Sequence, residues 1–430
     1  MNATGCAPIP HELCYWITFL TKALPPRSIG TFIELLIGAM LTPAGFVTES
    51  YLLLDVQRHW STYYKWLEEG KWSWLKLARQ FVCLLLQVRD DDVIHLAIDD
   101  TLSLRASKKA PGSVIHHQHG NKPNLASYVR GQCWVSLAAV FHRTEKETTA
   151  IPLLMRLIPS AGNTGKLVAA NVIMRAVSSL FEGRTVRVLV DCWYMRKRFI
   201  AQMNEYGFSV IGQARIDTRL YDEPLAKEVG QRGRPRKYGE KYTPKRIAHL
   251  RKTDATLTLY GKEQRVRYRT RIVKARFLDG QLVRAVWCEL DKGKAQWSKT
   301  RLFLSTDTSL SAERVLESYG MRWSIESMFY QLKELWGMGQ AWQQRRQTLH
   351  RWIHLMTIGY GLLHMLTLAL GENAAPLLKY APWRVQNPTT AGRIRLGLIK
   401  HFRYVNVRSW WNQKRKKFEA PGAQNYVRDG

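Results

Sequence analysis

Residues 312–340 read AERVLESYGMRWSIESMFYQLKELWGMGQ, and this stretch decides the fold prediction. It contains no proline, and Ser311 before it suits a helix start. Its apolar residues recur at steps of 4, 3, 4 and 3, which places them on one face of a helix. These residues are Met321, Ile325, Met328, Leu332 and Leu335. The stretch therefore predicts one amphipathic helix.

A second stripe of side chains lies beside this apolar face. Tyr319, Glu326 and Lys333 are seven residues apart, and Arg322 precedes Glu326 by four. At about 3.6 residues per turn the four align along the helix. The carboxylate can hold a hard cation, and the three donors can hold phosphate oxygens. Alternatively they are only ion pairs on a solvated helix, because Glu/Arg pairs at this spacing are common.

The composition points to a polyanionic partner. The 430 residues include 65 Lys and Arg against 34 Asp and Glu, for a net charge of +31. Nucleic acid is the first candidate partner and an anionic membrane surface the second. The hydrophobic share of 46% is ample for a packed core and indicates two or three domains. The many aromatic residues argue against a disordered basic chain.

Cysteine usage and hydropathy favour a cytoplasmic protein. The six cysteines are scattered without a C-x-x-C pair, so neither a zinc module nor a disulfide framework is expected. No signal peptide is apparent at the N-terminus. The most apolar stretch, 353–370, contains His354 and His364, which favours a buried helix over a membrane span.

Two apolar runs end in aspartate. VIHLAIDDT, residues 93–101, ends in Asp99-Asp100-Thr101, and VRVLVD, residues 186–191, ends in Asp191. A strand that delivers a carboxylate at its C-terminal end is a common way to place a metal ligand. Strand alternation puts Asp99 and Asp100 on opposite faces, so only one can reach a shared site. The alternative is that these aspartates only form turns.

Strands with interleaved helices predict an α/β core. Residues 1–90 are expected to be helical, either as a small bundle with an aromatic core or as a domain that binds DNA ends. The tail could be a further DNA contact or a partly ordered end. The predicted segments are 1–90 (N-terminal DNA-binding domain), 91–215 and 307–372 (two parts of one core), 216–306 (basic loop and β-rich insertion) and 373–430 (basic tail).

The insertion begins with a basic segment. Gly233-Arg234-Pro235 resembles the core of an AT-hook, which lies in the DNA minor groove, and Arg236 and Lys237 follow it. A flexible basic loop along phosphates is the alternative. A separate cluster, His116, His117 and His119, lies in a loop without a nearby cysteine or carboxylate, so a structural or DNA-facing role is expected before a metal site.

Three carboxylates remain at special places: Asp100 or Asp99, Asp191, and Glu326. If they converge, they repel one another unless cations neutralise them. Two Mg²⁺ ions would do so, and would also activate a nucleophile and stabilise the leaving oxygen of a displacement at phosphorus. A basic protein with such a cluster is expected to cut or join nucleic acid.

The spacing Y-x2-R-x3-E-x6-K, with the flanking RW-x-IE, is the most specific motif in the chain. Together with the order strand–Asp, strand–Asp, β insertion, helix–Glu, it resembles the DDE transposases of bacterial insertion sequences. The resemblance is to the cut-and-paste branch with the Tyr-Arg-Glu-Lys signature, and it covers about residues 95–370. It implies a ribonuclease-H-like fold with a β-strand insertion before the glutamate.

The resemblance also implies roles for individual residues. A D-T dipeptide follows the first strand in the family, which favours Asp100 over Asp99. Asp100, Asp191 and Glu326 would then bind two Mg²⁺ ions, for which Mn²⁺ can substitute. The residues expected to contact DNA are Tyr319, Arg322, Lys333, Arg215, Arg234, Arg236, Lys237, Trp297 and Trp323. The two tryptophans are candidates for stacking on a flipped base, with a structural role as the alternative.

The implied activity is cut-and-paste DNA transposition. The protein would bind terminal inverted repeats, cleave at each end and transfer 3′-OH ends into target DNA, as a homodimer that pairs two ends. It would act in the bacterial cytoplasm, on the nucleoid. One alternative is an inactive or domesticated relative that only binds DNA. Another is a ribonuclease-H-like enzyme that prefers RNA–DNA hybrids.

Overall fold

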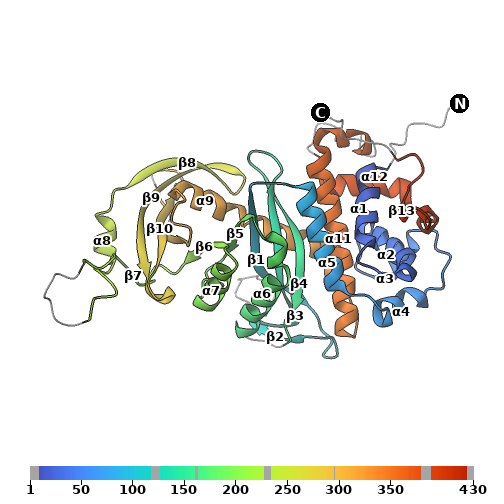
Figure 1. Ribbon diagram of the computed structural model, residues 1–430, viewed down its shortest axis with the longest axis horizontal. Helices are drawn as coiled ribbons and strands as arrows, with labels where there is room; N and C mark the ends of the chain where they lie inside the picture. The colour runs from blue at the N-terminus through green and yellow to red at the C-terminus, as the bar shows by residue number, and fades with distance from the viewer. Residues whose placement is uncertain are drawn as a thin grey trace.

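The computed structural model describes residues 9–117, 126–159, 163–226, 234–294, 296–378 and 389–423. It shows a mixed α/β protein in which one large sheet runs from a β-rich end, through a central core, to a mostly helical end (Figure 1). His119 and Gly233 lie outside the described residues, so the predictions for the full histidine cluster and for the AT-hook segment remain predictions.

Five strands form the centre of the sheet in the order β4-β3-β1-β5-β6. β1 is antiparallel to β3 and parallel to β5, while β6 is parallel to β5. This is the ribonuclease-H-like arrangement, and the predicted fold class is confirmed. The strands are β1 (Val93–Leu104), β3 (Tyr128–His142), β4 (Thr148–Leu157), β5 (Thr185–Val190) and β6 (Ser209–Ala214), with β2 (Ser113–His117) paired to one end of β3.

The parallel pairing of β1 with β5 sets the position of the acidic residues. A parallel pair needs a crossover connection, here one that includes helix α6 (Asn163–Val177). The register pairs Ile98 with Val190. Asp99 follows Ile98, as Asp191 follows Val190, so the two carboxylates lie at the same level on adjacent strands. Asp191 comes directly after β5, as predicted, but β1 continues to Leu104, so the prediction that Asp99 and Asp100 end their strand is wrong. Helix α7 (Lys197–Glu205) then connects β5 to β6.

The insertion between β6 and the helix at 312 continues the same sheet. β11 (Arg301–Ser305) pairs with β6, and the order then runs through β10 (Gln281–Leu290) to β9 (Lys262–Ala275). Shorter elements flank β9: β7 (Leu220–Tyr221), β8 (Thr253–Leu259) and the small helix α8 (Pro244–Ala248). The β-rich insertion was therefore expected from the sequence, but its fusion to the core sheet was not.

Helix α11 (Arg346–Leu370) is the centre of the helical end. It packs against α2, α5, α12 and β4, so the N-terminal helices and the C-terminal segment gather around one helix (Figure 1). The other elements are α1 (His11–Thr21), α2 (Ile29–Leu41), α3 (Val47–Leu52), α4 (Ser61–Glu69), α5 (Trp74–Val88), α12 (Ala391–Phe402), β12 (Trp411–Asn412) and β13 (Lys417–Phe418).

One helical stretch, Arg346–Leu378, is long and apolar enough to cross a membrane. Its most apolar window is 89% buried inside the protein, which agrees with the expectation of a buried helix at 353–370. The buried ring of His354 is accommodated because both of its nitrogens have hydrogen-bond partners. Its Nδ1 lies 2.7 Å from the His350 carbonyl oxygen, and its Nε2 accepts from the Met155 N–H at 3.3 Å.

The predicted helix at 312–340 is interrupted. α9 (Ala312–Met321) and α10 (Ser324–Glu334) are separated at Arg322 and Trp323. Both residues keep right-handed helical backbone angles, but the local bonds tighten from the i−4 to the i−3 pattern: Arg322 N donates to Tyr319 O, and Ile325 N to Arg322 O. The apolar periodicity continues across the break, so sequence periodicity alone could not reveal it.

We predict that acid destabilises the fold through His354. Burial lowers the pKa of His354 to about 4, against an ordinary value of 6.5. The unfolded chain therefore binds a proton that the folded chain excludes, and stability present above pH 6.5 is lost as the pH falls toward 4. Between pH 7 and pH 5, protonation of His354 in the unfolded chain should lower the free energy of unfolding by about 2 kcal/mol. Urea unfolding at the two pH values measures this loss.

The matched variants are His354→Gln and His249→Gln. Glutamine keeps a donor and an acceptor at position 354 but does not titrate, so it should reduce the loss of stability between pH 7 and pH 5 by about 2 kcal/mol. The rest of the pH dependence should remain, because burial also lowers the pKa values of His95, His350 and His364. His249 is exposed, and its replacement should leave the dependence unchanged. A pH dependence that is equal in both variants would contradict the assignment.

Candidate active site

Arg322, at the break between α9 and α10, joins two carboxylates from different elements. Its Nη1 lies 2.8 Å from Asp99 Oδ2 on β1, and its Nη2 lies 2.9 Å from Glu326 Oε1 on α10. The Arg322 side chain is only 10% exposed. The predicted ion pair between Arg322 and Glu326 is therefore present. It is not an isolated pair on a solvated helix, because the same guanidinium also binds Asp99 of the central sheet.

Asp191 lies directly after β5 and begins a tight turn. Its Oδ1 accepts hydrogen bonds from the backbone N–H groups of Trp193, at 2.9 Å, and Tyr194, at 3.3 Å. Such an Asx turn holds the carboxylate at the strand end. The charge of Arg322 also acts on Asp191, so one guanidinium lies within electrostatic reach of Asp99, Asp191 and Glu326.

The pKa values of Asp99 and Asp191 are raised because both carboxylates are buried. Burial raises the pKa of Asp99 to about 7; Arg322 opposes this rise, while the charges of Asp191 and Asp100 add to it. Burial also raises the pKa of Asp191, against the lowering effect of Arg322 and of the two N–H donors. Burial disfavours the charge of Arg322, but Tyr319, Asp99 and Glu326 outweigh that effect and raise its pKa.

Asp100 faces the opposite side of β1, toward helix α6. Its Oδ2 lies 2.7 Å from Lys166 Nζ, and its Oδ1 accepts from the Tyr194 hydroxyl at 3.2 Å. Cys133 Sγ is also near, at 3.6 Å. Burial disfavours the charge of Lys166, but Asp100 more than offsets this and raises the pKa of the amine. Asp100 is thus already neutralised on its own face of the sheet.

The two faces of β1 bear on the choice between Asp99 and Asp100. The expectation that they point to opposite faces agrees with the structure. The resemblance favoured Asp100, whereas the ion pairs with Arg322 place Asp99, and not Asp100, on the side of Glu326. The geometry therefore favours Asp99 as the first carboxylate of a shared site. Lys166 was not identified from the sequence, because nothing in a helix 66 positions from Asp100 marks it as a partner.

The residue types suit a hard divalent cation, since carboxylate oxygens from three elements surround one guanidinium. Their present arrangement does not complete a metal site. Within the described parts of the chain, no three Asp, Glu, His or Cys side chains lie near enough to hold one ion. Arg322 supplies the positive charge between Asp99 and Glu326 instead.

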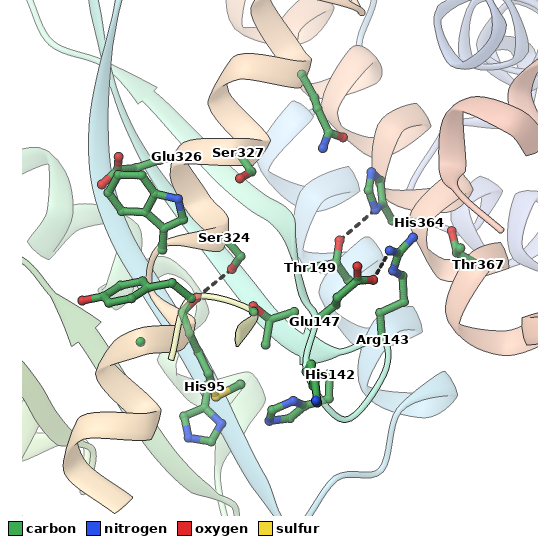
Figure 2. Close-up of a pocket in the computed structure, with 18 of the residues that line it drawn as sticks. His95, His142, Arg143, Glu147, Thr149, Ser324, Glu326, Ser327, His364 and Thr367 are labelled. Carbon is green, nitrogen blue, oxygen red and sulfur yellow. Dashed lines mark hydrogen bonds and ion pairs between the residues drawn. The ribbon is translucent and has the colours of Figure 1, made fainter. Parts of the chain in front are cut away.

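A cleft of about 1220 Å³ opens beside Glu326 (Figure 2). Ser324, Glu326 and Ser327 of α10 line it, and Trp323 and Tyr260 lie at the same wall. Trp323 is 50% exposed, and its ring meets that of Tyr260 edge to face at 6.1 Å. Glu326 can therefore be approached from solvent past exposed aromatic rings.

The other residues predicted to contact DNA are dispersed. Tyr319 is buried and lies against the guanidinium of Arg322, and Lys333 is half-buried in the last turn of α10. Arg215 is exposed and pairs with Asp217. Trp297 is in the insertion, with the guanidinium of Arg267 4.3 Å from its ring. Three further basic residues are exposed on the loop before α8, namely Arg234, Arg236 and Lys237.

Comparison with protein families matches residues 31–274, more than half of the chain, to the DDE superfamily endonucleases. The chain belongs to this family. Comparison with curated protein sequences found no match. Among solved structures the chain is similar to the cryo-EM structure of the piggyBac transposase synaptic complex with hairpin DNA. The identity is 10% and the TM-score 0.41, over 91% of this chain and 77% of that chain.

We predict that Arg322→Gln destabilises this DDE endonuclease by about 3–5 kcal/mol in the absence of metal, because it leaves the buried Asp99 carboxylate without a counter-charge. Urea unfolding measures the loss. Arg314→Gln is the matched control, since Arg314 is exposed and its ion pair with Glu317 should be worth less than about 1 kcal/mol. Equal losses in the two variants would contradict the role assigned to the bridge.

Proposed function

We propose that this DDE endonuclease is a DNA transposase that binds the terminal inverted repeats of its element and performs cut-and-paste transposition. The observation that carries the proposal is the bridge of Arg322 between Asp99 and Glu326, beside Asp191. It gathers the acidic groups of two neighbouring strands and one helix on one face of a ribonuclease-H-like sheet. The net charge of +31 supplies the affinity for a polyanion.

The residues proposed to hold two Mg²⁺ ions, or Mn²⁺ in their place, are Asp99, Asp191 and Glu326. When bound, such ions activate an attacking water or 3′-hydroxyl and stabilise the leaving oxygen at phosphorus. Asp100 takes no part in this proposal, because Lys166 and Tyr194 already engage its oxygens. The first ligand thus differs from the one favoured by the sequence resemblance.

Arg322 is proposed to change partners when DNA enters. Once cations neutralise Asp99 and Glu326, the guanidinium is released to bind a phosphate beside the cleaved bond, which its planar pair of donors suits. The ring of Tyr319 packs against the guanidinium of Arg322, with 5.6 Å between the ring centroid and Cζ. Lys333, two turns along α10 from Glu326, would contact the backbone farther along.

Trp323 is the better of the two tryptophan candidates for stacking on an unpaired base. Its ring is half exposed at the cleft that reaches Glu326. Trp297 is already covered by Arg267.

We further propose that two copies pair the two DNA ends, and that the protein acts in the cytoplasm on the nucleoid. An inactive, DNA-binding relative is the alternative function, and the cleavage test below separates the two.

We predict that Asp99→Asn, Asp191→Asn and Glu326→Gln each reduce metal-dependent cleavage at least about a hundredfold, because each removes a ligand oxygen charge. The assay uses a duplex that carries the inverted repeats flanking the gene, with Mg²⁺ or Mn²⁺, and compares the fraction cleaved over time. DNA binding without metal should persist in all three variants. Wild-type cleavage equal to that of Asp191→Asn would contradict the catalytic proposal.

Asp100→Asn separates the two candidate first ligands. If Asp99 is the ligand, this variant should retain cleavage within about tenfold of wild type, with some loss of stability because Lys166 loses its partner. The reverse pattern, with Asp99→Asn active and Asp100→Asn inactive, would restore Asp100 as the first ligand, as the sequence resemblance implied.

The choice of substrate separates a transposase from a ribonuclease. Faster cleavage of an RNA–DNA hybrid than of the repeat-containing duplex would indicate a ribonuclease.

A further inference from the structure

Strand β9 carries four arginines on one face, at alternate positions. They are Arg265, Arg267, Arg269 and Arg271, which we name the arginine ladder. The intervening side chains point the other way: Val266 and Tyr268 are buried, and the Tyr268 hydroxyl donates to Glu313 of α9. Since α9 covers that face, the ladder lies on the face of the insertion sheet turned away from α9.

The spacing of the ladder suits a linear polyanion. At about 3.4 Å per residue, successive arginines are about 6.8 Å apart, and the four span about 20 Å. That span corresponds to about six base-pair steps of duplex DNA at about 3.4 Å each. A strand is rigid along its length, so the four guanidinium groups are presented in a line rather than as a mobile cluster.

Two members of the ladder are already oriented by the protein. Arg267 Nε donates to Glu289, and Arg265 lies 3.8 Å from Asp254. The ring of Trp297 lies against both guanidinium groups, at 4.3 Å from Arg267 and 5.8 Å from Arg265. Each acceptor occupies only part of a guanidinium, which leaves further N–H donors for phosphate oxygens.

The other two members are less engaged. Arg269 is half-buried, and its Nε is buried without a hydrogen-bond partner among the described residues, whereas Arg271 is exposed. The charge of Arg271 acts on Asp222, whose carboxylate already accepts a hydrogen bond from Tyr242 and pairs with Arg246. Such partly satisfied guanidinium groups are ready to bind an anion.

Further cations extend this surface. Arg251 and Lys252 are exposed and directly precede Thr253, whose register partner on β9 is Tyr268. They therefore lie at the edge of the sheet beside Arg269. The four ladder arginines with Arg251 and Lys252 make six cations, against the four acids Asp222, Asp254, Glu289 and Asp291, so the surface keeps a net positive charge.

We propose that the arginine ladder binds the phosphate backbone of a duplex DNA segment laid along β9. This segment is separate from the one at Glu326, because α10 follows α9 on the opposite side of the insertion sheet. The inference rests on the proposed function only in that the partner is DNA. It adds a second contact surface, which would hold DNA flanking the cleavage point.

The test measures duplex binding at several salt concentrations by fluorescence anisotropy, without metal so that no cleavage occurs. Arg269→Gln with Arg271→Gln should weaken binding more than tenfold at low salt. It should also lower the slope of log affinity against log salt by about 1.8, since two phosphate contacts are lost at about 0.9 each. Arg269→Lys with Arg271→Lys keeps both charges and should retain most of the slope.

The matched control, Arg198→Gln with Arg403→Gln, removes two exposed arginines outside the insertion and should leave the slope nearly unchanged. Unfolding midpoints confirm that all variants fold. A wild-type slope in the ladder variant, or an equal decrease in the control, would overturn the proposal. If the wild type itself binds no duplex, the proposed function fails, which is distinguishable from failure of the ladder alone.

Discussion

The ion pairs of Arg322 with Asp99 and Glu326 are the constraint on which the site depends. A largely buried carboxylate is costly unless a counter-charge neutralises it, and here one guanidinium serves a strand and a helix together. The bridge fixes where α10 begins relative to β1. The break between α9 and α10 lies at Arg322, the residue that makes both ion pairs.

The sheet supplies the other half of the arrangement. Parallel pairing of β1 with β5 brings Asp99 and Asp191 to the same level on adjacent strands. The insertion then returns through β11, which pairs with β6, so α9 starts from the same sheet that carries the aspartates. An insertion that is continuous with the core therefore positions Glu326 and at the same time presents β9 as an extended surface.

The stripe of Tyr319, Arg322 and Glu326 could be predicted from the sequence, because helical spacing is a local property. The α/β core and the β-rich insertion could also be predicted, from the periodicity of apolar runs. The side of β1 that faces Glu326 could not, since register and helix packing are decided by contacts between residues more than 200 positions apart. Lys166 was missed because no local pattern marks a side chain of α6 as the partner of an aspartate 66 positions earlier. The packing of the N-terminal helices and α12 on α11 likewise depends on contacts between distant parts of the chain.

The most direct test is a crystal structure of the protein with duplex DNA and Mn²⁺, recorded with anomalous scattering. The account predicts anomalous peaks among the carboxylates of Asp99, Asp191 and Glu326, with Arg322 moved from these acids to a DNA phosphate and the Lys166–Asp100 ion pair intact. Peaks coordinated by Asp100 instead, or Arg322 still bridging Asp99 and Glu326 beside a bound metal, would contradict it.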